Sequence, residues 1–261
     1  MNDRLRQILN LVLAVAQFAA PGFHAVTGIG GPIGRRAVED GFLAPEQPAG
    51  WAFSIWFPIF ALSLAYAVHQ ALPSERENPV YRRIGAATAA MFAAGTVWML
   101  WTQIFGSSVV LLPLIFGMYA ATMIASSALA RTGLAGLALE GRLRHLLPAL
   151  LGLQGGWLTA AIMLNTTSVL RGSTAEPFGL SMSVYALATL LPATVLAMAT
   201  ILARRANGWF VFAFGWALVA IAFTNIVTQP NWPIAAATLA ALGAIVLGHQ
   251  NFIRTLKVKE I

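Results

Sequence analysis

Residues 208–228 read GWFVFAFGWALVAIAFTNIVT, a run without a single charged side chain. A helix needs about 20 mostly apolar residues to cross the hydrocarbon core of a bilayer. Similar runs recur along the chain, at about 7–25, 50–72, 84–104, 108–130, 146–170, 181–203 and 232–253. Lipid cannot satisfy backbone polar groups, so each run must close its hydrogen bonds as a helix. The sequence therefore predicts an all-α integral membrane protein with about eight transmembrane helices.

Composition supports this class. Of the 261 residues, 58% are hydrophobic and 10% are charged, whereas soluble domains carry roughly 25% charged residues. The basic residues are scattered through short connections and form no patch of the kind that binds nucleic acid. The chain has no cysteine, which excludes disulfides and thiolate ligands. The expected partners are the lipid bilayer and a hydrophobic small molecule, and not nucleic acid.

Charge predicts the orientation. With the amino terminus inside, only Arg35, Arg36 and Arg171 of the 16 lysines and arginines fall outside. We therefore expect a multi-pass protein of a bacterial inner (plasma) membrane, with both termini cytoplasmic. The first run could instead be a signal peptide. Asn10 and Gln17 within it favour retention, and its loss would leave seven helices in the same orientation.

Several chemistries are excluded by what the runs contain. The only lysines, Lys257 and Lys259, follow the last run, so a retinal Schiff base in mid-membrane is excluded. The runs hold no Asp, Glu, Lys or Arg, the side chains that ion-coupled pumps normally keep inside the bilayer, which disfavours a proton-driven transporter without excluding one. No histidine spacing fits a metal site, and no hydrolase or kinase motif is present. We predict no metal ligand and no catalytic residue.

Aromatic and amide side chains are the most distinctive feature. The candidates for a binding site are Trp51 and Trp56 in the second run, Trp98 and Trp101 in the third, and Trp157 and Asn165 in the fifth. All are expected in the outer half of the membrane, beneath a long external segment, residues 26–49. Indoles with a few amides suit a large, flat, mostly apolar ligand with polar edges.

Two other interpretations of the same residues stay open. Tryptophans at helix ends also form the ordinary aromatic belt, to which we assign Trp209 and Trp232. Gly152 and Gly156 beside Trp157 indicate close helix packing. Gly-Trp pairs recur at 50–51, 156–157, 208–209 and 215–216, but at no constant spacing that would define a repeat.

Two stretches carry a family resemblance. Residues 48–60, beginning Pro-Ala-Gly-Trp-Ala-Phe, resemble the Pro-Pro-Gly-Trp-x-Phe segment of the TspO/MBR family, the tryptophan-rich sensory proteins that include the mitochondrial translocator protein. Residues 156–165, Gly-Trp-Leu-Thr-Ala-Ala-Ile-Met-Leu-Asn, resemble its fifth-helix segment, with the same spacing from Trp to Asn. Trp51 and Trp56 are one residue closer than in short members, and the last three helices resemble the longer relatives of about 260 residues.

The resemblance implies a TspO-like five-helix domain, residues 1–172, followed by three further helices and a tail, residues 173–261. It implies a porphyrin, haem or sterol-like ligand, no covalent cofactor and often a homodimer. It carries Trp51, Phe53, Trp157 and Asn165 over as ligand-binding positions, followed by Trp56, Trp98 and Trp101. The leading hypothesis is a receptor or carrier, with a sensory or regulatory role. The alternatives are a secondary transporter that uses all eight helices and light-dependent porphyrin degradation.

Overall fold

The computed structural model describes residues 1–33, 44–134, 141, 143–171, 181–203 and 206–258. Within these ranges the regular structure is helical, and eight helical spans are long and apolar enough to cross a membrane, which confirms the predicted class. The predicted boundary between residues 172 and 173 and residues 34–43 of the external segment lie outside them. So do several charges of the orientation argument: Arg35, Arg36, Arg142, Arg204, Arg205 and Lys259.

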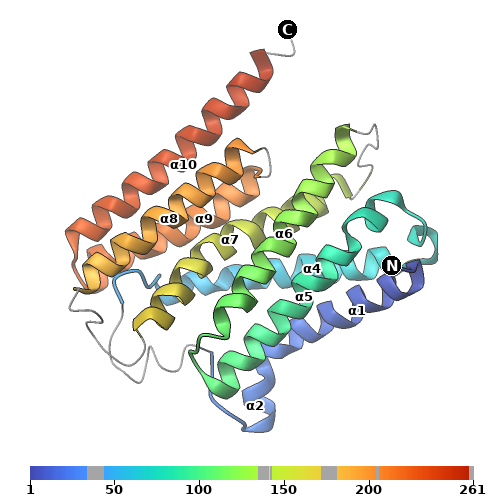
Figure 1. Cartoon of the computed structure of the whole chain (residues 1–261), viewed down its shortest axis with the longest axis horizontal. Coiled ribbons are helices and arrows are strands. Elements are labelled where there is room, and N and C mark those ends of the chain that lie inside the picture. The colour runs from blue at the N-terminus through green and yellow to red at the C-terminus, as the bar shows by residue number, and fades with distance from the viewer. Residues whose placement is uncertain (34–43, 135–140, 142, 172–180, 204–205, 259–261) are drawn as a thin grey trace. The chain divides into compact units, whose positions relative to one another are not determined.

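The helices follow the predicted runs closely (Figure 1). The first span is α1 (Asp3–Ala19), the 3₁₀ turn η1 (Ala20–Gly22) and α2 (Phe23–Thr27), and the second is η2 (Gly50–Ile55) and α4 (Trp56–Ala71). After η3 (Pro73–Glu75) come α5 (Pro79–Phe105), α6 (Leu111–Leu134), α7 (Leu143–Arg171) and α8 (Met182–Leu202). The last two spans are α9 (Gly208–Phe223), which continues as the π-helical turn η5 (Thr224–Thr228), and α10 (Trp232–Val258).

Proline positions show how the spans accommodate a residue that cannot donate a helical N–H bond. Pro58 and Pro113 lie in the first turns of α4 and α6, where that N–H is not needed, and Pro192 lies inside α8. Pro21 differs, because it lies in η1, where α1 ends and α2 begins. Proline lacks the N–H that would continue the helical ladder, and η1 bridges the break within one span.

Contacts divide the chain into two compact units, one of residues 1–42 and 56–151, the other of residues 43–55 and 152–261. In unit 1, α5 packs against both α1 and α6, and α1 also packs against α4 (Figure 1). In unit 2, α10 packs against α8 and α9, and η2 packs against α9. The predicted domains, 1–172 and 173–261, stay a prediction.

Helix α1 has the reverse of a soluble helix's amphipathicity. Its buried side chains are almost all polar: Arg6, Gln7, Asn10, Ala14 and Gln17. Its exposed side chains are apolar: Leu5, Ile8, Val12, Val15 and Phe18. Polar side chains in a lipid-embedded helix are stable only where protein satisfies them, so this pattern fixes which face of α1 packs against α4 and α5.

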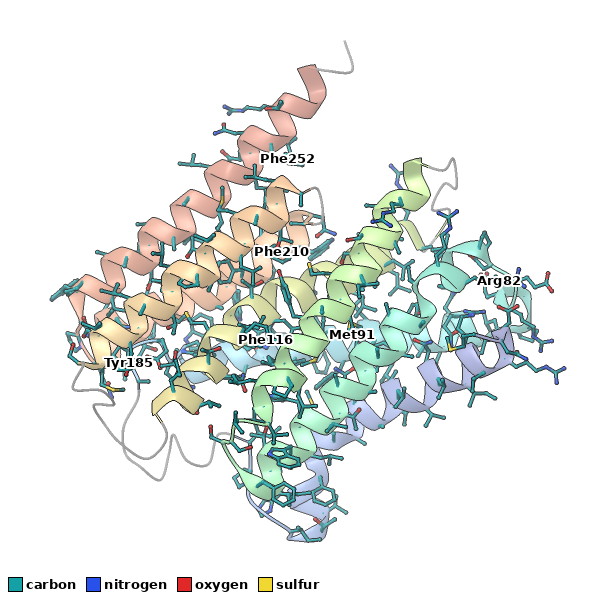
Figure 2. The ribbon with its side chains drawn as sticks, viewed as in Figure 1. Arg82, Met91, Phe116, Tyr185, Phe210 and Phe252 are labelled. Carbon is teal, nitrogen blue, oxygen red and sulfur yellow. The ribbon has the colours of Figure 1, made fainter. Side chains whose placement is uncertain are left out.

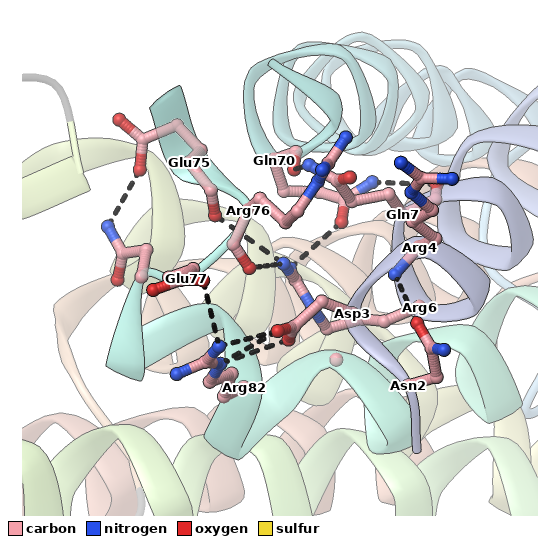
Figure 3. Close-up of polar contacts among 12 residues, drawn as sticks. Asn2, Asp3, Arg4, Arg6, Gln7, Gln70, Glu75, Arg76, Glu77 and Arg82 are labelled. Atoms are coloured by element: carbon pink, nitrogen blue, oxygen red, sulfur yellow. Dashed lines mark hydrogen bonds and ion pairs between the residues drawn. The ribbon is translucent and has the colours of Figure 1, made fainter. Parts of the chain in front are cut away.

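Arg6 holds one end of unit 1 together (Figure 3). Its guanidinium donates to Gln70 Oε1 at 3.1 Å and to the Arg76 carbonyl at 2.7 Å, and it lies 5.8 Å from the centre of the Tyr81 ring. A Cβ at Gly85 would lie 2.6 Å from Arg6 Cδ, so this glycine gives the side chain room to cross α5. The sequence treats Arg6 as a cytoplasmic topology charge, but the structure buries it as a hydrogen-bond donor.

Two neighbours of Arg6 complete this network. Gln7 Nε2 donates to the carbonyls of Gln70 and Leu72 at 2.9 and 3.0 Å, where α4 ends and η3 begins. Asn10 Nδ2 donates to the Gly85 carbonyl at 2.8 Å, and Asn10 Oδ1 accepts from Thr88 Oγ1 at 2.6 Å. These bonds join α1 to α4 and α5.

Two glutamines of unit 1 differ in how well they are satisfied. Gln103 Nε2 donates to the Ala20 and Met99 carbonyls at 2.7 and 3.0 Å, and its Oε1 accepts from His24 N at 3.0 Å. Gln17 is fully buried beside Gly95, and within the described part of the chain neither amide atom has a hydrogen-bond partner.

We therefore expect the same change, glutamine to methionine, to affect the melting temperature differently at the two positions. Gln103→Met should lower the melting temperature, since each buried group left unpaired costs about 1–3 kcal/mol. Gln17→Met should leave the melting temperature unchanged or raise it, because methionine fills the space without an amide to satisfy. Thermal unfolding of the detergent-solubilised protein measures both. A fall for Gln17→Met as large as that for Gln103→Met would contradict the assignment.

In unit 2, α7 and α9 cross closely at two glycines. A Cβ at Gly156 would collide with the Phe210 carbonyl and lie 2.9 Å from Ala213 Cβ, and one at Gly152 would lie 2.7 Å from Trp209 Cβ. Phe210 is a buried residue of α9 (Figure 2). The predicted close packing at Gly152 and Gly156 is confirmed, and α9 is its partner.

Gly156→Ala should therefore destabilise the fold by about 1–3 kcal/mol, because the new methyl group meets backbone that cannot move cheaply. Gly208→Ala is the matched control on α9, since a Cβ there meets nothing within 4 Å. Retention of native protein after graded heating compares the two variants. Equal retention would show that the α7–α9 crossing tolerates a wider spacing.

Candidate aromatic site

The turn η2 presents two aromatic side chains that are partly open. Trp51 is 41% exposed and Phe53 is 37% exposed. Both belong to unit 2, and each contacts at least one other aromatic ring. Between them, Ala52 is fully buried. A 3₁₀ turn has about three residues per turn, so the side chains on either side of Ala52 leave the turn in different directions.

Phe53 packs against Trp157 of α7. Their ring centroids are 5.5 Å apart and the planes meet at 81°, an edge-to-face contact that aromatic rings favour. Trp157 is only 2% exposed. In this conformation its indole therefore supports Phe53, and Phe53 is the ring of the pair that a ligand can reach.

Trp51 packs against two rings of α9. Its centroid is 4.7 Å from that of Trp216 and 6.2 Å from that of Phe223, again edge to face. Trp216 Nε1 also donates to the Ala52 carbonyl at 2.9 Å. The indole of Trp51 is thus held from α9 while part of its surface stays accessible.

Asn165 lies on the same helix as Trp157 and is also buried. Its Nδ2 donates to the Ala161 carbonyl at 2.7 Å, a bond within α7. This bond fixes the orientation of the amide on α7.

The other predicted residues belong to unit 1. Trp56 stacks on Phe60 at 5.3 Å, and Trp101 packs on Phe105 at 4.4 Å while its Nε1 donates to Ser108 Oγ at 2.8 Å. Trp98 is half-buried on α5. The seven predicted positions therefore divide between the units, with Trp51, Phe53, Trp157 and Asn165 in unit 2.

The sequence missed Trp216 and Phe223, which supply one side of the cluster. One signal pointed to Trp216, because Gly215-Trp216 is among the recurring Gly-Trp pairs, and three of these four pairs contribute to this cluster or its support. Phe223 carries no such signal, since it is one phenylalanine in a uniformly apolar run.

Metal and acid–base chemistry have little support in this part of the fold. Across the described ranges no three His, Asp or Glu side chains gather as a metal site. Among the described residues of unit 1, two histidines have side-chain partners: His69 Nδ1 lies 2.7 Å from the Tyr81 hydroxyl, and His24 Nδ1 lies 3.1 Å from the Ile29 carbonyl oxygen.

A family model described as TSPO-like protein matches residues 7–249 of the chain. The chain belongs to this TSPO-like family. The resemblance to this family is thereby confirmed, and the match extends into the eighth span of the TSPO-like protein. Neither the curated proteins nor the solved structures gave a match.

Proposed function

We propose that this TSPO-like protein is a membrane receptor or carrier that binds a flat, largely apolar ligand, of the tetrapyrrole or sterol-like class, at the aromatic site of unit 2. The carrying observation is that Trp51 and Phe53 are partly exposed while other rings fix their positions. Preorganised aromatic faces lose little side-chain entropy when a ring system stacks on them.

The surroundings of the site are mostly apolar. Hydrophobic and aromatic side chains dominate beside the Asn165 amide, the Trp216 indole N–H and the Ala52 carbonyl, and Glu46 is a buried carboxylate in the segment that carries Trp51. Sites lined in this way select ligands mostly by shape and by a few placed polar groups. A sensory or regulatory role would follow if binding changed the conformation of residues 44–55, the segment that carries Trp51.

The probe is protoporphyrin, titrated against purified protein and followed by the shift of its main absorbance band. Trp51→Ala and Phe53→Ala should each weaken binding at least about fivefold, since an aromatic contact contributes about 1 kcal/mol beyond its buried area. Trp157→Ala and Asn165→Ala should weaken it too, but Trp157→Ala also leaves a cavity that costs about 3–5 kcal/mol of stability. The exposed rings are therefore the cleaner test.

Trp232→Ala is the matched control for Trp51→Ala, because it removes an indole of the same absorbance and size that is 65% exposed at the start of α10. The affinity of Trp232→Ala for protoporphyrin should equal that of the wild type. Saturable binding that Trp51→Ala and Phe53→Ala leave unchanged would reject this site, and no saturable binding would reject the ligand class.

A secondary transporter that uses all eight helices is the second candidate. It is favoured by the π-helical turn η5 with its buried Asn225, because local departures from the α-helix are frequent at functional sites in membrane spans. Uptake into proteoliposomes under an ion gradient separates the two functions. Flux above that of empty vesicles favours transport, whereas equilibrium binding alone favours the receptor.

We also propose that the protein lies in a bacterial plasma membrane with both termini cytoplasmic, so that the aromatic site opens outward. The absence of cysteine makes single-cysteine variants clean reporters. Glu77→Cys lies before α5 and Val109→Cys before α6, and both native side chains are exposed. In intact spheroplasts a membrane-impermeant maleimide should label Val109→Cys and spare Glu77→Cys.

Both variants should react after the membrane is permeabilised, which controls for reactivity. The reverse labelling pattern in intact spheroplasts would invert the orientation and place the aromatic site on the cytoplasmic side.

A further inference from the structure

We infer that α9 and η5 position the ligand-binding aromatics, with Trp216 and Asn225 as positioning residues, so that the seventh span is part of the site. This inference rests on the proposed function. Its structural basis is the strap, defined here as residues 44–55, which leads into α4 and carries Trp51 and Phe53.

Three hydrogen bonds hold the strap on α9. Asn225 Nδ2 donates to the Pro45 carbonyl at 2.6 Å, Ala49 N donates to the Ala220 carbonyl at 3.2 Å, and Trp216 Nε1 donates to the Ala52 carbonyl at 2.9 Å. Positions rise along the strap while their partners fall along α9. The strap therefore runs antiparallel to α9 in a single register.

The strap needs these partners because it is not a regular α-helix. Non-helical backbone is tolerated in membrane proteins where other protein groups satisfy its carbonyls and N–H groups. Here two of the three bonds use side chains, Trp216 of α9 and Asn225 of η5. These side chains supply the hydrogen-bond donors that lipid lacks, and they fix the position of the strap.

Asn225 lies at the beginning of the π-helical turn η5, and such turns are frequent at functional sites. Asn225 is 1% exposed and also donates to the Ile221 carbonyl at 2.8 Å, while its own carbonyl accepts from Asn231 N at 2.8 Å. Its side chain is thereby held in one orientation.

Trp216 acts on the site in two ways. Its N–H fixes the backbone at Ala52, and its ring braces Trp51 at 4.7 Å. On the other side of Ala52, Phe53 meets Trp157. Loss of the indole N–H should therefore free Ala52 and disturb both exposed rings, although Trp216 itself need not touch the ligand.

The test removes the N–H and keeps an aromatic ring. Trp216→Phe in the full-length protein should weaken protoporphyrin binding about fivefold or more. It should also shift or broaden the ¹⁹F signal of Trp51 in protein labelled with 5-fluorotryptophan, where the missing peak of Trp51→Phe supplies the assignment. Trp209→Phe, the same change on the same helix, should alter neither the affinity nor the Trp51 signal.

Asn225→Leu, which removes the donor to Pro45 at nearly constant size, provides a second variant and should act in the same direction. Unchanged affinity and an unchanged Trp51 signal in both variants would overturn the inference. A moved Trp51 signal with unchanged affinity would reject the role of Trp216 and Asn225 in binding and leave them only the role of holding the strap in place. If wild-type protein fails to bind protoporphyrin, the proposed function fails, while the ¹⁹F signal still tests whether these hydrogen bonds hold the strap.

Discussion

The hydrogen bonds that Arg6, Gln7 and Asn10 donate to α4 and α5 show the constraint on which the rest of the structure depends. Lipid offers neither donors nor acceptors, so a polar group at membrane depth must find its partner within the protein. Helix α1 meets this constraint by turning its polar face inward, where its side chains donate to carbonyls at the end of α4 and on α5. The apolar face of α1 can then lie against lipid at no cost.

The same constraint shapes unit 2. The strap has backbone groups that no helix of its own satisfies, and α9 supplies their partners through Asn225, Ala220 and Trp216. Close packing of α7 on α9 depends on Gly152 and Gly156, because any side chain there would push the helices apart. Helix α9 thus connects the strap and Trp51 with the closely packed helix α7. A preorganised binding surface requires such rigid support.

Helix α9 and η5 therefore contribute to the same aromatic cluster as η2. Trp216 and Phe223 of α9 form one side of this cluster, and Asn225 of η5 bonds to the strap that bears the exposed rings. The family match, residues 7–249, includes all of these elements. Partial exposure of Trp51 and Phe53 then appears as the accessible edge of a supported cluster.

The sequence by itself determined the eight spans, their limits and the family, because hydrophobic run length and charge are local properties that a bilayer reads directly. It also indicated Phe53, Trp157 and the Gly152–Gly156 packing, since these lie within recognisable motifs. It could not reveal that Arg6 is buried, because a charge near a helix end looks the same whether it faces water or caps a neighbouring helix. Nor could it reveal the pairing of Trp51 with Trp216, which are far apart in the chain. Only the tertiary structure decided that contact, because register between distant segments depends on which polar groups satisfy one another.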